Sequence, residues 1–143
     1  MQSWSVVEEL RIGSVDDPET SLTRVNGLAI GPQGHVYIAQ PQDGQIRIYD
    51  RDGRFIRAFG GRGNGPGEFT RLLAIGLLAD TVYALNIDPA RVSLFTLEGE
   101  HIKTTLLAAP PADDYGILVP FMLFPDGTGV ASRAFTPEAV ASG

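Results

Sequence analysis

A glycine-rich stretch containing one arginine, GGRGNGPGEF at residues 60–69, has the composition of a loop that could bind a phosphate group. Its spacing fits neither of the common phosphate motifs. A dinucleotide motif would need a glycine at Pro66, Glu68 or Thr70, and a P-loop would need a lysine in place of Pro66. Both motifs also open a helix, whereas the following FTRLLAIG has the composition of a strand. We therefore expect a structural connector, whose glycines permit left-handed dihedrals and whose Phe69 anchors the chain in the core.

Few other residues could carry chemistry. The two histidines, His35 and His101, do not occupy equivalent positions in the pattern described below, so we expect no shared metal site. Adjacent acids such as Asp16 and Asp17 point to opposite sides of a strand and cannot share an ion there. The chain has no cysteine and no nucleophile motif. We accordingly predict no catalytic residue, no metal ligand and no cofactor.

The elements that position these residues repeat with a period of 46. HVYIAQPQDGQIRIYDRDGRFIRAF from His35 matches TVYALNIDPARVSLFTLEGEHIKTT from Thr81 at that offset throughout. Upstream, GLAIG at 27–31 matches LLAIG at 72–76 at an offset of 45. A third, partial copy begins at LFPDGTGVAS, residues 123–132. A fixed period of this length is typical of propellers and solenoids.

Each unit holds four short runs of β-branched, aromatic and aliphatic residues, separated by turn formers such as GPQG, PQDG and DRDG. Four strands every 46 residues predict an all-β fold of β-propeller blades, each a four-stranded antiparallel meander. In the first unit we expect strands at 25–30, 35–39, 45–49 and 55–59. We divide the single domain, 1–143, into an N-terminal outer strand and loop (1–22), a first blade (23–69), a second blade (70–110) and a partial third blade (111–143).

The first unit, from Val25 to Phe69, resembles an NHL-type repeat of the six-bladed β-propeller superfamily, of the bacterial type. The second unit is a weaker copy, and residues 4–13 resemble the outer strand that usually precedes a first blade. The family usually has an aspartate at the end of the second strand, which holds the following turn. Gln40 and Asn86 stand there, and their amides can also bond a turn. The resemblance implies an incomplete propeller of two and a half to three blades.

One face of such a propeller carries the connectors between blades and the turns between second and third strands. Loops on a rigid scaffold are where binding sites usually lie, so we predict a ligand site on this face. The candidate ligand-binding residues are Gln40, Asp43, Arg62, Asn64, Arg71, Asn86, Asp88 and Arg91, beside Gln42 and Glu68. Tyr37 and Tyr83 share a repeat position, and we interpret them as blade-packing residues.

The charge balance limits the classes of partner. A net charge of −6 argues against a general affinity for DNA or for an acidic membrane surface. The longest apolar run, GILVPFMLF at 116–124, is too short to span a bilayer and contains Pro120, so we expect a soluble chain. The first residues show no signal peptide. The compartment stays open: periplasmic or extracellular if a leader has been removed, otherwise cytoplasmic.

Three functions are compatible with these observations. We expect a non-enzymatic module that binds a protein or small-molecule ligand through the face described above. The resemblance also implies an alternative, a metal-dependent enzyme of the lyase or lactone hydrolase type, because such propellers hold a metal near their axis. A third hypothesis, again implied by the resemblance, is RNA binding through the first blade, where Arg47, Arg51, Arg54, Arg57, Arg62 and Arg71 cluster.

Two and a half blades would leave sheet faces uncovered at both ends, and repeat proteins need a neighbour or a polar cap there. We therefore expect the chain to be the remainder of a longer six-bladed propeller or a half-propeller that closes as a homo-oligomer. Trp4, the only tryptophan, is expected to anchor the N-terminal strand in the core.

Overall fold

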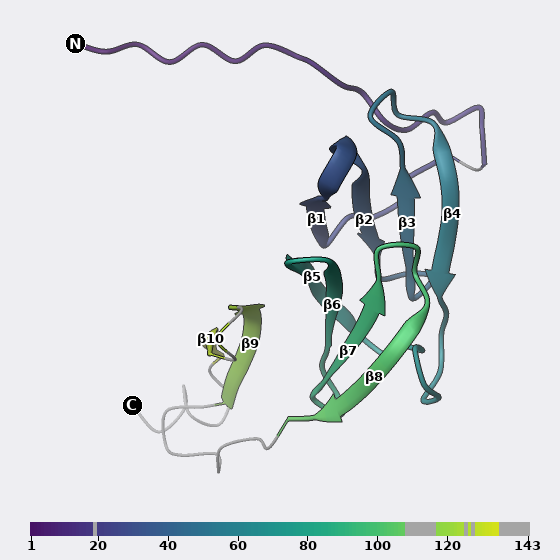
Figure 1. Ribbon diagram of the computed structural model, residues 1–143, viewed down its shortest axis with the longest axis vertical. Helices are drawn as coiled ribbons and strands as arrows, with labels where there is room; N and C mark the ends of the chain where they lie inside the picture. The colour runs from purple at the N-terminus through teal and green to yellow at the C-terminus, as the bar shows by residue number, and fades with distance from the viewer. Residues whose placement is uncertain (19, 108–116, 125, 127, 135–143) are drawn as a thin grey trace, which may run out of the picture.

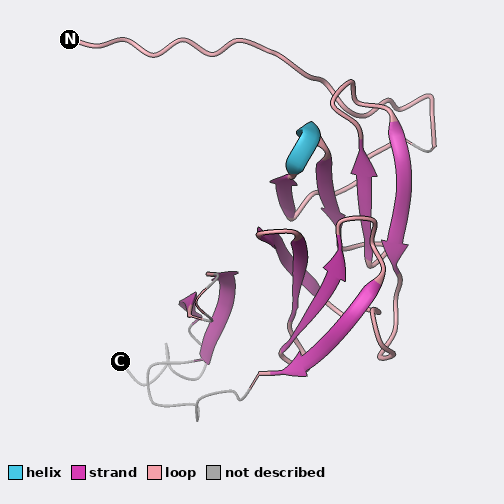
Figure 2. Cartoon of the chain, in the orientation of Figure 1, coloured by secondary structure: helices cyan, strands magenta, loops and turns pink. Residues whose placement is uncertain are grey.

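The computed structural model describes residues 1–18, 20–107, 117–124, 126 and 128–134, and it is almost entirely β-structure (Figures 1 and 2). Two antiparallel four-stranded sheets follow the chain order, and a two-stranded sheet comes after them. The first sheet contains β1 (Gly27–Ile30), β2 (Val36–Gln40), β3 (Gln45–Tyr49) and β4 (Phe55–Gly60), with a 3-10 turn η1 (Pro32–Gly34) after β1. The second contains β5 (Leu72–Leu78), β6 (Thr81–Asn86), β7 (Arg91–Thr96) and β8 (His101–Leu106); β9 (Ile117–Leu123) pairs with β10 (Gly129–Ala134).

This arrangement confirms the predicted fold class of antiparallel meanders. The first strands of the units lie beside one another, because β1 contacts β5 and β5 contacts β9. From there each four-stranded sheet runs outward to β4 or β8 (Figure 1). The sheets described do not close into a ring, as expected of an incomplete propeller. The segments 108–116 and 135–143 of the expected third unit lie outside the described residues, and the division into blades by residue number stays a prediction.

The main core lies between the first two sheets. Alternation along β3 turns Ile46 and Ile48 toward the second sheet, where they join Phe69, Val82 and Phe95 in one buried cluster. Burying each such side chain contributes about 1.5–3 kcal/mol, so this interface holds the two blades together. Phe69 is fully buried, which confirms that it anchors the connector in the core.

The two tyrosines at the shared repeat position each bond to the next sheet along the chain. The Tyr37 hydroxyl donates to the Leu97 carbonyl at 2.9 Å, and the Tyr83 hydroxyl accepts from the Leu123 amide at 3.2 Å. Both side chains are almost completely buried. Their interpretation as blade-packing residues is confirmed, although the two hydroxyls bond different parts of the following unit, the β7–β8 turn and the end of β9.

The pairing register corrects the alignment of the first strands. Ile30 pairs with Val36, and Leu77 pairs with Val82. Val36 and Val82 are 46 residues apart, but Ile30 and Leu77 are 47 apart (77 − 30), not 45 as GLAIG and LLAIG indicated. The reason is local: five residues, including η1, connect Ile30 to Val36, whereas only Ala79 and Asp80 connect Leu78 to Thr81, so β5 extends further.

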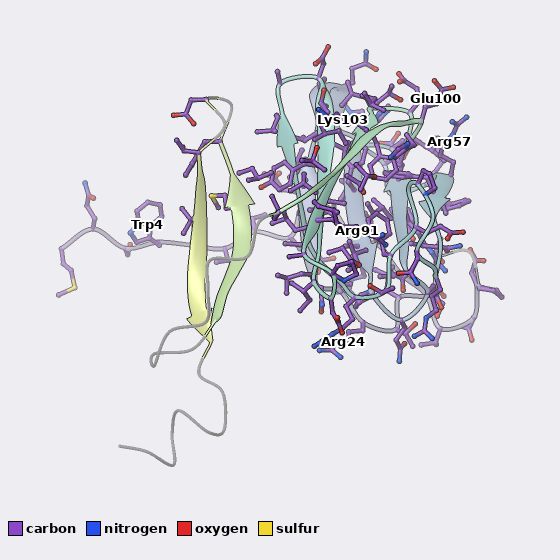
Figure 3. All side chains as sticks on the ribbon, turned by 90° about the horizontal axis from the view of Figure 1, so that it is seen from below. Trp4, Arg24, Arg57, Arg91, Glu100 and Lys103 are labelled. Carbon is purple, nitrogen blue, oxygen red and sulfur yellow. The ribbon has the colours of Figure 1, made fainter. Side chains whose placement is uncertain are left out.

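The expected outer strand at residues 4–13 is not formed. Residues 1–14 lie in no strand, and Trp4 is 94% exposed, so its predicted place in the core was wrong. Figure 3 shows Trp4 on an extended segment that leaves the blades. An isolated strand forms only beside a partner that accepts its backbone hydrogen bonds, and none of the described strands runs beside this segment. Among the described residues, no helix has the length and apolarity needed to cross a membrane.

Candidate functional site

The connector between the first two sheets lies against the turn between β2 and β3. The Gly61 amide donates to the Gly44 carbonyl, and the Phe69 amide donates to the Gly61 carbonyl, each at 2.8 Å. Gly60 and Gly67 adopt φ angles of 90° and 72°, which glycine reaches without strain. We call the surface formed by this connector (60–71) and by the β2–β3 and β6–β7 turns (41–44 and 87–90) the connector face. The expected clustering of connectors and second turns is confirmed for these segments.

The buried side chain of Arg91 hydrogen-bonds the backbone of the connector. Its side chain comes from the start of β7, and the residue is only 6% exposed. The guanidinium donates to the Gly63 carbonyl at 3.2 Å, the Asn64 carbonyl at 3.2 Å and the Glu68 carbonyl at 2.8 Å. These bonds use its NH1 and NH2 groups, so Arg91 fixes the loop that borders the connector face instead of offering its charge to a ligand.

Asn86 and Gln40 hold the same face at the ends of β6 and β2. The Asn86 carbonyl oxygen accepts from the Arg71 amide at 2.8 Å, and its amide donates to the Ile87 and Pro89 carbonyls at 3.2 and 2.9 Å. Gln40 accepts from the Thr23 amide at 3.2 Å. Both residues are 1% exposed. A side-chain amide at this position therefore hydrogen-bonds the segment that precedes the first strand of its sheet. Asn86 also hydrogen-bonds the β6–β7 turn that follows it.

Three arginines border a hollow of about 360 Å³ on the connector face. Arg24 precedes β1, Arg62 belongs to the connector, and Arg71 precedes β5; all three are exposed. Among the described residues, none of their guanidinium groups makes a hydrogen bond or an ion pair. We call this surface the arginine hollow, and its other lining residues are Asn26, Pro41, Gln42, Thr70, Leu72, Leu73 and Ile87. Figure 3 shows Arg24 at the margin of the blades and Arg91 within them.

Sequence reasoning missed Arg24, although a signal was present. Leu-Thr-Arg at 22–24 and Phe-Thr-Arg at 69–71 are 47 residues apart in sequence, and each precedes the first strand of its sheet. The offset of 45 had hidden this repeat. The segments before β1 and β5 therefore bring Arg24 and Arg71 to one hollow.

The remaining candidates lie on the connector face with other contacts. Asp43 and Arg47 approach to 3.9 Å in an exposed depression that Arg62 also borders. Asn64 is exposed in the connector, and its carbonyl accepts from Arg91. Asp88 is exposed in the β6–β7 turn, where its carbonyl accepts from the Thr70 hydroxyl at 2.7 Å. Asp43, Asn64 and Asp88 thus surround the arginine hollow without lining it.

The opposite face holds a smaller cavity of about 190 Å³ between the two sheets, lined in part by His35, Ile48 and Glu98. His101 lies on β8 and bonds the Thr104 hydroxyl at 2.8 Å. In the part of the chain that the structure describes, no group of three or more His, Cys, Asp or Glu side chains is placed to hold a metal ion.

The comparisons with known proteins bear on the fold. Residues 24–115 match the DUF5128 family, described as a 6-bladed beta-propeller. The chain belongs to this family. A candidate exported protein from Bacteroides fragilis NCTC 9343 superimposes with a TM-score of 0.62 at 19% identity, over 90% of this chain and 36% of that protein. A protein of unknown function from Bacteroides caccae has a TM-score of 0.45 at 15% identity, over 80% and 50% of the two chains. No match was found among curated proteins.

The chain thus spans about a third of the length of the Bacteroides fragilis protein. At 19% identity the likeness concerns the fold alone. For this member of the DUF5128 family, function has to be argued from the connector face itself.

Proposed function

We propose that this chain is a non-enzymatic binding module whose ligand binds on the connector face. The observation that carries the proposal is the arginine hollow, a concave polar surface with unpaired cationic groups on a rigid support. Binding sites are typically hollows with a few placed polar groups, and recognition residues typically lie on loops held by a stable scaffold. The hydrogen bonds of Arg91 and Asn86 supply that support.

The finer family assignment belongs to the same proposal. We assign the repeat to the NHL type on the sequence of the first unit, from Val25 to Phe69, and we take Gln40 and Asn86 as its variant of the usual aspartate. The metal-dependent enzyme stays the alternative. A rise in the unfolding midpoint with calcium, zinc or magnesium would support that alternative, because a ligand specific for the folded state stabilises it.

The test of the binding function is a thermal-shift screen of metabolites and short peptides against the protein, followed by NMR titration of ¹⁵N-labelled protein with each hit. We expect hits to perturb amide signals of the connector and of the β2–β3 and β6–β7 turns. Signals confined to the opposite face, around His35 and Glu98, would contradict the proposal.

A further inference from the structure

We propose that the arginine hollow binds a small polyvalent oxyanion, a ligand with two or more carboxylate or phosphate groups. The inference rests on the proposed binding function and names its ligand class.

The first argument is the uncompensated charge. Among the residues that the structure describes, no acidic side chain lines the arginine hollow, although the whole chain has a net charge of −6. Four other arginines have a partner: Arg11 with Glu8 at 2.8 Å, Arg47 with Asp43 at 3.9 Å, Arg54 with Asp52 at 3.7 Å, and Arg57 with the Glu98 carbonyl at 2.9 Å. Among the described residues Arg51 has none, but it lies apart from the hollow. Three like charges around one hollow repel one another, and an anion bound among them would reverse that interaction. A ligand with several negative groups has the most favourable electrostatic interaction with the three arginines.

The second argument is that the backbone holding each arginine is fixed. The Thr23 amide beside Arg24 donates to Gln40, and the Arg71 amide donates to Asn86. Arg62 pairs with Phe69 in an isolated bridge within the connector. A guanidinium on a fixed backbone binds carboxylate or phosphate with two parallel hydrogen bonds at a smaller entropic cost. The repeated Thr-Arg dipeptide therefore presents two arginine side chains to the hollow, one from the segment before each first strand.

A third observation comes from Gln40, at the end of β2. Its side-chain nitrogen is buried and, among the described residues, has no hydrogen-bond acceptor, while the residue is 1% exposed. Its neighbours Pro41 and Gln42 line the arginine hollow. A buried donor without an acceptor is unfavourable. Gln40 does not itself line the hollow, so a water that bridges its nitrogen to a bound oxyanion would supply the acceptor.

The lining also separates a small oxyanion from single-stranded RNA. RNA modules stack bases on aromatic rings, and no Phe, Tyr, Trp or His lines the arginine hollow. Instead Pro41, Leu73 and Ile87 offer aliphatic contacts, which suit the short carbon skeleton of a carboxylic acid.

The test is isothermal titration calorimetry with citrate and with pyrophosphate, on the whole chain and on the variants Arg24→Gln, Arg71→Gln and Arg51→Gln. Arg51 is exposed at the other end of the sheet, in the β3–β4 turn, and is the matched control. A hydrogen-bonded ion pair is worth about 1.5–3 kcal/mol, so we expect Arg24→Gln and Arg71→Gln each to weaken binding about tenfold or more. Arg51→Gln is expected to bind as the unchanged chain does, and affinity is expected to fall with salt.

Citrate and pyrophosphate distinguish carboxylate from phosphate as the preferred group. The inference would be overturned if neither anion bound at millimolar concentration. It would also be overturned if Arg51→Gln lost as much affinity as Arg24→Gln and Arg71→Gln. Binding of oligouridylate without binding of either small anion would favour RNA and also overturn it. If an uncharged ligand from the thermal-shift screen still perturbs amide signals of the connector face, the proposed binding function stands and only the proposal of an oxyanion ligand is wrong.

Discussion

Arg91 shows how one charged side chain can organise a glycine-rich loop. Its guanidinium binds three connector carbonyls that would otherwise point into a largely buried space. Sequence reasoning had placed Arg91 among the ligand-binding candidates because it lies on the connector face. Its burial makes it a residue that supports the face.

We expect Arg91→Met to destabilise the protein by about 2–4 kcal/mol, because three carbonyls would lose a charged donor while the aliphatic volume is largely kept. Urea unfolding followed by circular dichroism measures the difference. The matched control is Arg57→Met, an exposed arginine with one bond to the Glu98 carbonyl, whose change should stay within about 0.5 kcal/mol. Equal effects of the two substitutions would show that the three bonds do not stabilise the connector.

The Tyr37 hydroxyl makes the free energy of unfolding depend on pH in the alkaline range. Burial, and secondarily the negative charge of Glu98, raises the pKa of the Tyr37 hydroxyl above its usual value. The folded state therefore favours the protonated phenol. This contribution to the free energy of unfolding is complete below the unfolded pKa, about 10, and is lost as pH rises through the folded pKa.

We expect Tyr37→Phe to be less stable by about 1 kcal/mol at neutral pH, because the Leu97 carbonyl loses its donor. Above pH 10 the difference between the two proteins should shrink. Urea midpoints measured from pH 7 to above pH 10 test this, and the comparison cancels the titration of other groups. A difference that stays constant or grows across this range would contradict the role of the Tyr37 proton.

At the scale of elements, the close approach of β5 and β6 depends on a glycine. A Cβ built on Gly76 would overlap the hydroxyl end of Tyr83, while one on Gly31 would lie 2.8 Å from a ring carbon of Tyr37. Neither glycine has a positive φ, so the space for the tyrosine ring, and not the backbone angle, requires glycine.

We expect Gly76→Ala to cost about 1–3 kcal/mol, as overpacking a filled core does, and Gly31→Ala to cost less because its overlap is smaller. Thermal unfolding of both variants gives the order. In a protein that already carries Tyr83→Leu, Gly76→Ala should cost less than it does in the unchanged chain, since the clash partner is gone. An equal cost of Gly76→Ala in the two backgrounds would show that β5 needs Gly76 for another reason.

At the scale of the whole molecule, the face of the first sheet that points away from the second is only partly covered. Val36, Ile38 and Tyr49 are buried there with help from Ile12 and Leu22. Leu28 and Ile30, on neighbouring β1, are 57% and 67% exposed. Exposed apolar patches of this kind usually mark an interface or cause aggregation.

We expect this chain to self-associate at micromolar concentration, and Leu28→Lys with Ile30→Lys to weaken the association by placing charges in the contact. Sedimentation velocity over a concentration series measures it. Ile102→Lys, which changes an exposed residue of β8, is the control and should associate as the unchanged chain does. A strictly monomeric unchanged chain would contradict the prediction.

The sequence by itself determined the strands of the two four-stranded sheets and their order. Alternation in QIRIY predicted β3 at its observed bounds, turn formers predicted the hairpins, and Phe69 and the two tyrosines were correctly predicted to pack between blades. These features are local, since side-chain alternation and turn chemistry depend on neighbouring residues along the chain.

Only the tertiary structure decided what depends on distant partners. The offset of 47 between β1 and β5 follows from hairpin lengths and cross-strand pairing, and only the folded chain brings Arg24 and Arg71 to one hollow. The burial of Arg91 depends on a connector more than twenty residues away in sequence, and a strand at 4–13 would need a partner that none of the described strands supplies. Local patterns encode which residues can pair or pack, but their partners are set by long-range contacts that no single segment specifies.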